Sequence, residues 1–156
     1  MVLLRRLLGA LVVFVATLAA AVPAAEPTPT NGAHVAVPPM KTSIYVGSVT
    51  LSTGDFRQEG DFFRSTYEAK VRPWFFWSET GQIAIKLPAT DLMRLALGQT
   101  VEFTGEATNH KGKPRVVTGR AQPADPLSGK IKVRIMADGI ELIFNGTYQL
   151  TTGALK

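Results

Sequence analysis

The residues best suited to acid–base or metal chemistry lie in a short polar segment. Asp55, Glu59 and Asp61 follow Thr53-Gly54 closely, and three neighbouring carboxylates are a candidate calcium or proton-transfer site. A calcium loop, however, needs six or more oxygen ligands at a defined spacing, which Asp-Phe-Arg-Gln-Glu-Gly-Asp does not supply. We therefore interpret this segment as a polar turn.

Nucleophiles and metal ligands are equally sparse elsewhere. The chain has no cysteine and two histidines, His34 in a proline-rich stretch and His110 in the turn-like Asn-His-Lys-Gly segment. A zinc site needs more nitrogen or sulfur ligands than this, and neither Gly-x-Ser-x-Gly nor Ser-x-x-Lys occurs. The sequence predicts no catalytic, cofactor-binding or metal-binding residue, and we expect a non-catalytic protein.

The most unusual short segment is aromatic, Trp74-Phe75-Phe76-Trp77. In a strand its side chains alternate between two faces. If Ser78 to Gly81 form a hairpin loop, Trp74 and Phe76 pair with Ile85 and Ile83 and enter the core. Phe75 and Trp77 then stand outside near Lys86, where they could stack on a sugar, enter a membrane interface or dock a partner. Alternatively, another element covers the outer pair, or the pair continues the inward face of the preceding strand.

A second candidate surface is basic. Between Lys111 and Arg134 lie seven lysines or arginines and a single acid, Asp125. Lys130, Lys132 and Arg134 share one strand face and could contact anionic lipid headgroups, phosphates or an acidic polymer. The alternative is a solvated face balanced across the sheet by acidic neighbours. The plausible neighbours are Glu102, Glu106 and Glu141.

The elements that position these residues are strands. Apolar or small residues alternate with polar or charged residues over 63–72 and 101–108, as in strands with one face exposed to solvent. Residues 43–52 form a first strand in which the apolar parity shifts at Gly47, which we interpret as a bulge. Residues 25–40 contain four prolines and predict a disordered linker.

Asp138-Gly139 is a two-residue hairpin signal that tolerates positive φ. The register it implies sets Ala137 against Ile140 and Val133 against Phe144, which sorts the apolar side chains to one face. Further hairpins are expected around 78–81 and 109–112. One short helix is expected near 90–97, with Thr90 as its cap and Gly98 at its end.

Together, these expected elements predict an all-β domain over 41–156 with about eight antiparallel strands. Consecutive hairpins favour an up-and-down barrel, since closure removes exposed edges; the alternative is a two-sheet sandwich. In strand number this outline is similar to lipocalin-like exported barrels, including the bacterial polyisoprenoid-binding kind. The resemblance is one of fold and assigns no site residue.

Residues 1–24 have the pattern of a secretory signal peptide: Arg5 and Arg6, an apolar run over 7–22 and small residues around Pro23. The run is shorter than the roughly 20 residues that span a bilayer as a helix, so we expect cleavage near Ala24, or after Ala21, rather than an anchor. A lipoprotein is excluded because there is no cysteine. The mature chain then has 15 basic and 12 acidic residues, a net charge of +3.

So small a charge excess does not indicate nucleic acid. We expect an exported, periplasmic or secreted protein with no transmembrane span in its mature chain. Two functions remain open. The first is a domain that binds an apolar, lipid or glycan ligand in its interior or at the aromatic patch. The second is an interaction module that contacts an anionic component of the cell envelope through its basic face.

Overall fold

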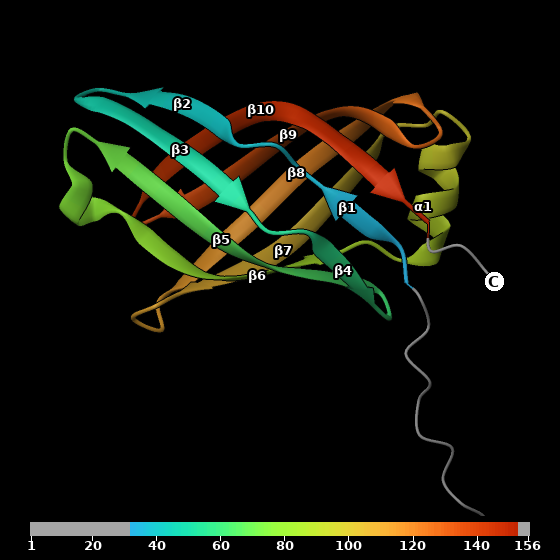
Figure 1. Ribbon diagram of the computed structural model, residues 1–156, viewed down its shortest axis with the longest axis horizontal. Helices are drawn as coiled ribbons and strands as arrows, with labels where there is room; N and C mark the ends of the chain where they lie inside the picture. The colour runs from blue at the N-terminus through green and yellow to red at the C-terminus, as the bar shows by residue number, and fades with distance from the viewer. Residues whose placement is uncertain (1–31, 153–156) are drawn as a thin grey trace, which may run out of the picture.

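The computed structural model describes residues 32–152, which form a closed antiparallel β-barrel (Figure 1). The ring runs β5–β6–β7–β8–β9–β10–β1–β4 and returns to β5, while β2 and β3 extend the wall outside the ring. The predicted barrel is therefore confirmed over the two-sheet sandwich. The strands are β1 (His34–Ala36), β2 (Met40–Ile44), β3 (Gly47–Thr53), β4 (Phe56–Glu59), β5 (Phe62–Arg72), β6 (Glu79–Lys86), β7 (Val101–Asn109), β8 (Pro114–Asp125), β9 (Ser128–Ala137) and β10 (Ile140–Thr151).

The first strands depart from prediction. β1 pairs with β10 and β4, so the expected disordered linker does not extend to residue 40; its earlier part lies outside the described residues, as does the predicted signal peptide. Pro38 and Pro39 separate β1 from β2 because proline has no N–H to donate to a ladder. Beyond them, β2 pairs with β3 alone.

The predicted bulge at Gly47 is wrong, because the chain reverses at Tyr45-Val46 and places β2 and β3 in a hairpin. The alternation of apolar residues changes phase at Gly47 because the residues before and after it belong to two different strands. Gly47 is required for a different reason: a Cβ there would lie 1.9 Å from the carbonyl oxygen of Arg72. The β2–β3 turn therefore rests directly against the end of β5.

The core fills the barrel with alternate side chains of the strands. Phe63, Tyr67 and Val71 on β5 are buried, as the alternation predicted, and Val101 and Phe103 on β7 are buried likewise. The described core is one continuous apolar cluster. Its most deeply buried large side chains are Phe144, Leu51, Val101 and Val117.

The last hairpin has the predicted register, with Ala137 opposite Ile140 and Val133 opposite Phe144. Its turn residues Asp138 and Gly139 have φ of 49° and 84°. Two successive positive φ values are those of a primed turn, whose twist matches that of the strands. The sequence therefore located this hairpin to the residue.

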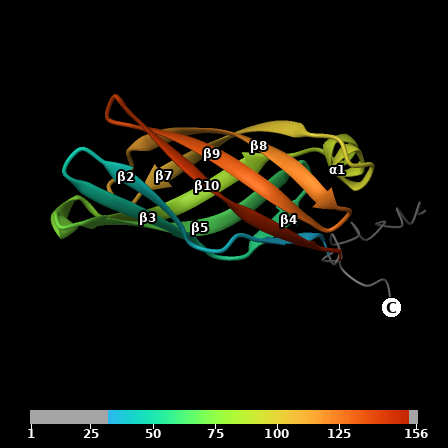
Figure 2. The same ribbon diagram turned by 90° about the horizontal axis from the view of Figure 1, so that it is seen from above.

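Helix α1 (Ala89–Ala96) lies across one end of the barrel, close to the predicted 90–97 (Figures 1 and 2). It buries Leu95 against the core, and Leu92 packs beside it. The opposite end carries the β2–β3, β5–β6, β7–β8 and β9–β10 connections, and we call it the loop end. Within residues 32–152, no helix has the length and apolar character needed to cross a bilayer.

Candidate binding site at the loop end of the barrel

The four aromatic residues lie in a loop and not in a strand. β5 runs on to Arg72, so Phe63 and Ser65 occupy the positions opposite Ile85 and Ile83. The predicted pairing of Trp74 and Phe76 with these isoleucines is therefore wrong, as is the predicted loop at 78–81. The hairpin turns earlier, over 73–78, through a 3₁₀ turn, η1 (Phe75–Trp77).

All four side chains of this segment, which we call the aromatic loop, are solvent-exposed. The exposed fractions are 41% for Trp74, 77% for Phe75, 60% for Phe76 and 56% for Trp77. Their rings contact one another at centroid distances of 5.4–6.0 Å, mostly edge to face. The interpretation that these residues join the core is therefore wrong, and Phe75 and Trp77 are available to a ligand.

The β2–β3 turn adds two further apolar side chains, Tyr45 and Val46, both largely exposed. A Cβ on Gly47 would lie 3.0 Å from Cδ of Pro73, so this turn abuts the aromatic loop. Both turns project at the loop end (Figure 2). We call Tyr45, Val46 and the aromatic loop together the aromatic tip. Sequence reasoning missed Tyr45 and Val46 because it placed them inside a strand.

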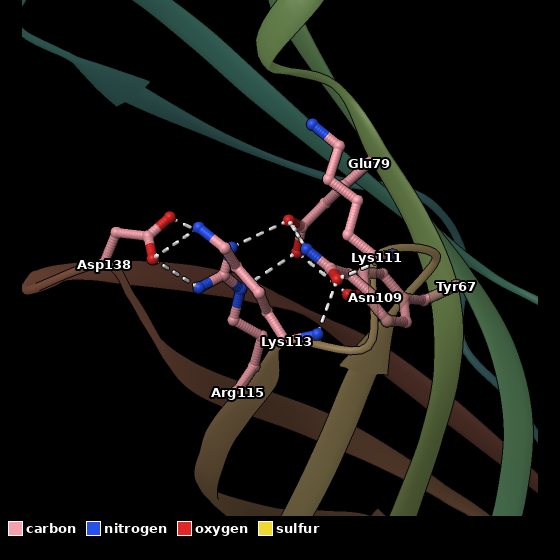
Figure 3. Close-up of polar contacts among 7 residues, drawn as sticks. All are labelled: Tyr67, Glu79, Asn109, Lys111, Lys113, Arg115 and Asp138. Carbon is pink, nitrogen blue, oxygen red and sulfur yellow. Dashed lines mark hydrogen bonds and ion pairs between the residues drawn. The ribbon is translucent and has the colours of Figure 1, made fainter.

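A layer of polar side chains lies at the loop end, where β6 begins shortly after the aromatic loop (Figure 3). Its centre is Arg115, which points inward from β8 and is buried. The guanidinium bonds both carboxylate oxygens of Glu79, at 3.0 and 3.3 Å, and both of Asp138, at 3.0 and 3.1 Å. Two bidentate pairs hold one cation between two anions, which compensates its burial.

Glu79 also accepts hydrogen bonds from Tyr67 Oη at 2.8 Å and from Asn109 Nδ2 at 3.0 Å. The Asn109 side-chain oxygen in turn accepts from the backbone N–H groups of Lys111 and Lys113. This network therefore fixes the β7–β8 loop against the start of β6. We call Tyr67, Glu79, Asn109, Arg115 and Asp138 the polar layer.

The pKa shifts in this layer favour an ionised Glu79 and a protonated Tyr67 at neutral pH. Burial alone would raise the pKa of Glu79, but the hydrogen bonds from Arg115, Asn109 and Tyr67 outweigh it and hold that pKa below its ordinary value. Burial, together with the hydrogen bond to Glu79, raises the pKa of Tyr67 well above its usual range. A general acid or base needs a pKa near the working pH. The layer therefore suits a structural role better than proton transfer.

The barrel interior holds a small apolar cavity of about 70 Å³ at the α1 end. Leu92 and Leu95 of the helix contribute to its wall, together with core phenylalanines. Small-molecule sites are typically about 300 Å³ or larger. The interior is therefore filled mainly by the protein's own side chains.

The cavity wall also includes Thr53, whose Oγ1 is buried with no hydrogen-bond partner. It is the only such side-chain polar atom found within residues 32–152.

The predicted basic residues lie on the barrel wall, away from the aromatic loop. Lys130 and Arg134 on β9 are exposed and Lys132 is half-buried. Of the predicted acidic neighbours, Glu141 lies 3.9 Å from Arg134. Lys132 instead faces Arg120 on β8. Lys86 ends β6 at the α1 end of the barrel, so the structure does not bring the candidate residues into one site.

Glu102 and Glu106 lie on β7, opposite Arg120 and Val116 of β8. Neither reaches the β9 lysines, whose cross-strand neighbours include Gln122 for Lys130. The predicted balance across the sheet therefore holds for Arg134 and not for Lys130 or Lys132.

The segment interpreted as a polar turn is mostly strand, since Phe56–Glu59 form β4, and its carboxylates lie apart from this site. Glu59 pairs with Arg64 at 2.9 Å. Over the part of the chain that the structure describes, no three acidic or histidine side chains are grouped as a metal site would require.

The polar layer was missed although its sequence signal was present. Arg115 shares the inward parity of Val117 and Ala121 on its strand, and a charged residue at such a position requires buried partners. The structure is thus a β-barrel whose loop end exposes the aromatic tip in front of the polar layer. No family model, curated protein or solved structure matches this chain.

Proposed function

We propose that this protein is an exported, non-catalytic binding module that takes its ligand at the aromatic tip and not inside the barrel. The observation that carries the proposal is the exposure of all four residues of the aromatic loop. Soluble proteins rarely leave large contiguous apolar patches uncovered unless a ligand, membrane or partner covers them. Export itself is proposed from the signal-like pattern of residues 1–24.

The barrel supports this role by holding the aromatic loop rigid. β5 and β6 pair from Ala69 and Glu79 onward, and Ser78 Oγ accepts a hydrogen bond from the N–H of Val71 at the base of the loop. The polar layer then anchors Glu79, the residue directly after Ser78. A rigid aromatic surface binds with little loss of side-chain entropy.

The chain provides its own probe of this site. Its two tryptophans are Trp74 and Trp77, so intrinsic tryptophan emission reports on the aromatic loop alone. We expect emission to shift when a ligand covers the tip. Titration with lipid vesicles and with soluble oligosaccharides tests both apolar and glycan ligands, and native mass spectrometry of the exported fraction identifies any co-purifying molecule.

A matched pair of variants locates the binding. Phe75→Ser/Phe76→Ser keeps both tryptophans and removes two exposed rings. Met93→Ser/Leu97→Ser removes two comparably exposed side chains at the α1 end. We expect the first double variant to lose binding and the second to retain it. Equal loss in both would contradict the assignment to the aromatic tip.

The basic face supports a second candidate function, contact with an anionic envelope component. Like charges directly opposite each other destabilise a sheet, and Arg120 faces Lys132 across β8 and β9. Arg120 has Glu102 as its other cross-strand neighbour, whereas Lys132 has the uncharged Asn145. An anionic partner would relieve the remaining repulsion. Salt-sensitive binding of an acidic polymer that Arg120→Gln/Lys132→Gln abolishes, while tip variants bind normally, would favour this candidate.

A further inference from the structure

The aromatic tip has the composition and shape of a membrane-interface anchor. Trp and Tyr prefer the headgroup level of a bilayer because their rings are apolar and carry one polar group, and Phe reaches the acyl boundary. Here they occupy two adjacent turns, and no residue of η1 is buried. Projecting turns of this kind can enter an interface that a flat wall cannot.

The residues behind the tip limit how far it can enter. Glu79 and Arg115 lie in the polar layer immediately after the aromatic loop, within a network that also includes Asp138 (Figure 3). Charged groups are excluded from the hydrocarbon region. The tip can therefore insert to the depth of its own side chains, while the barrel stays outside the bilayer.

Charge at the two ends of the barrel favours the same orientation. The loop end carries Arg72, Lys111 and Lys113, all exposed, and the nearby Asp138 is shared between Arg115 and Lys113. At the α1 end, Arg94 is paired with Asp91 and Arg64 with Glu59. Lys86 is accompanied there by two exposed acids, Asp61 and Asp125, at the β4–β5 and β8–β9 connections. An anionic surface therefore attracts the loop end more strongly than the α1 end.

A glycan is less well matched to this surface. Sugar binding needs hydrogen-bonding groups beside the stacking ring. Ser78, the polar side chain next to Trp77, already accepts a hydrogen bond from Val71. The rings of the aromatic loop add only the indole N–H groups of Trp74 and Trp77, which donate but cannot accept, whereas sugar hydroxyls do both.

We propose that the aromatic tip inserts into the interface of a lipid bilayer that contains anionic headgroups, and that Lys111, Lys113 and Arg72 contact those headgroups. This inference rests on the proposed function, since it names the ligand of the same surface. It makes the protein a peripheral membrane binder held by aromatic insertion and by charge together.

Co-sedimentation of the purified protein with vesicles tests the inference. We compare phosphatidylcholine alone with phosphatidylcholine mixed with phosphatidylglycerol, and measure quenching of Trp74 and Trp77 by brominated acyl chains. We expect preferential binding to the mixed vesicles, a blue shift of the emission and quenching by bromines near the headgroups. Absence of vesicle binding by the folded wild-type protein would overturn the inference.

Variants separate the two contributions. Phe75→Ser/Phe76→Ser should lower the vesicle affinity at least about tenfold and abolish the quenching. Lys111→Glu/Lys113→Glu should lower the affinity for the anionic vesicles by a similar factor and weaken its dependence on salt. Met93→Ser/Leu97→Ser, at the opposite end, should bind as the wild type does. Circular dichroism checks that each variant is folded.

The outcomes also distinguish this inference from the proposed function. An emission shift with soluble oligosaccharides and none with vesicles would overturn the lipid inference and retain the aromatic tip as the binding site. Vesicle binding that survives Phe75→Ser/Phe76→Ser but not Arg120→Gln/Lys132→Gln would overturn both in favour of the basic face.

Discussion

Arg115 is the charged side chain on which the loop end of the barrel depends. It is buried, and its two carboxylate partners come from the start of β6 and from the β9–β10 turn. Removing one partner of a buried ion pair leaves the other charge uncompensated, which is more damaging than removing both. The energetic role of each member therefore shows best in single substitutions.

Glu79→Gln should lower the free energy of unfolding by roughly 1–3 kcal/mol at neutral pH, because Arg115 loses one of its anions. The folded-state pKa of Glu79 is depressed. Its contribution is therefore fully present above the unfolded pKa of about 4.3 and is lost as pH falls through the folded value. Urea unfolding at several pH values should show the difference between wild type and variant shrinking in acid.

The control for this comparison is Glu68→Gln. Glu68 pairs with Lys70 at 3.2 Å, but both side chains are about half exposed. Exposed pairs contribute little, so this variant should unfold nearly as the wild type does. A constant difference between Glu79→Gln and wild type across the acid range would contradict the pKa assignment.

Thr53→Val should stabilise the protein. Thr53 Oγ1 is buried beside the apolar cavity without a partner, and an unsatisfied buried hydroxyl costs roughly 1–3 kcal/mol. Valine has nearly the same shape and removes that cost. A rise in thermal midpoint is expected, and a fall would indicate that the hydroxyl bonds a water in the cavity.

At the scale of elements, turns decide which strands meet. Gly139 has φ of 84°, and a Cβ there would contact nothing within 4 Å. Gly119 is the opposite case, since a Cβ there would lie 2.3 Å from the ring of Phe103. The two glycines are therefore required for different reasons, backbone conformation and close packing.

Gly139→Ala should cost roughly 1–2 kcal/mol, the penalty of a left-handed conformation for an L-residue. Gly119→Ala should cost more, because the phenylalanine ring must move within a packed core. Denaturant unfolding of both variants measures the difference. Equal effects, or a larger loss in Gly139→Ala, would contradict this explanation.

The elements that the sequence predicted well are those with local determinants. Alternation over 63–72 located the long strand β5, and Asp138-Gly139 fixed the last hairpin. The β5–β6 loop was misplaced because Trp and Phe favour strands by propensity, while the actual turn has no Asn-Gly or Asp-Gly signal. β1 was missed because its pairing with β10 and β4 is long-range.

At the scale of the whole molecule, hairpin connectivity was enough to predict the barrel but not its two ends. The sequence left open whether Phe75 and Trp77 are exposed or buried; both are exposed, and their predicted place in a strand was wrong. The clustering of the aromatic loop with Tyr45 depends on the end of β5 touching the β2–β3 turn, a contact between segments far apart in the sequence. The β3–β5 ladder, which pairs Ser48 with Arg72, creates that contact, and no local pattern encodes it.

At Pro38 and Pro39 the chain leaves β1, and the following strand, β2, forms no hydrogen-bonded ladder with its neighbour β10 among the described residues. β10 pairs with β9 along most of its length and with β1 only near its end, and none of the described ladders joins it to β2. The side chain of Met40 lies against Gly146 of β10 at this seam. The β2–β3 hairpin is thus hydrogen-bonded to the rest of the wall on one side only, through the ladder between β3 and β5.

Amide hydrogen exchange should detect this one-sided attachment of the β2–β3 hairpin. Exchange protection follows the free energy of local opening, so amides of β2 should exchange faster than those of β7, β8 and β9, which are paired on both sides. Uniform protection around the wall would contradict this. The turn of the β2–β3 hairpin carries Tyr45 and Val46. Local opening of this hairpin therefore determines how freely these two residues of the aromatic tip can adjust to the surface that they contact.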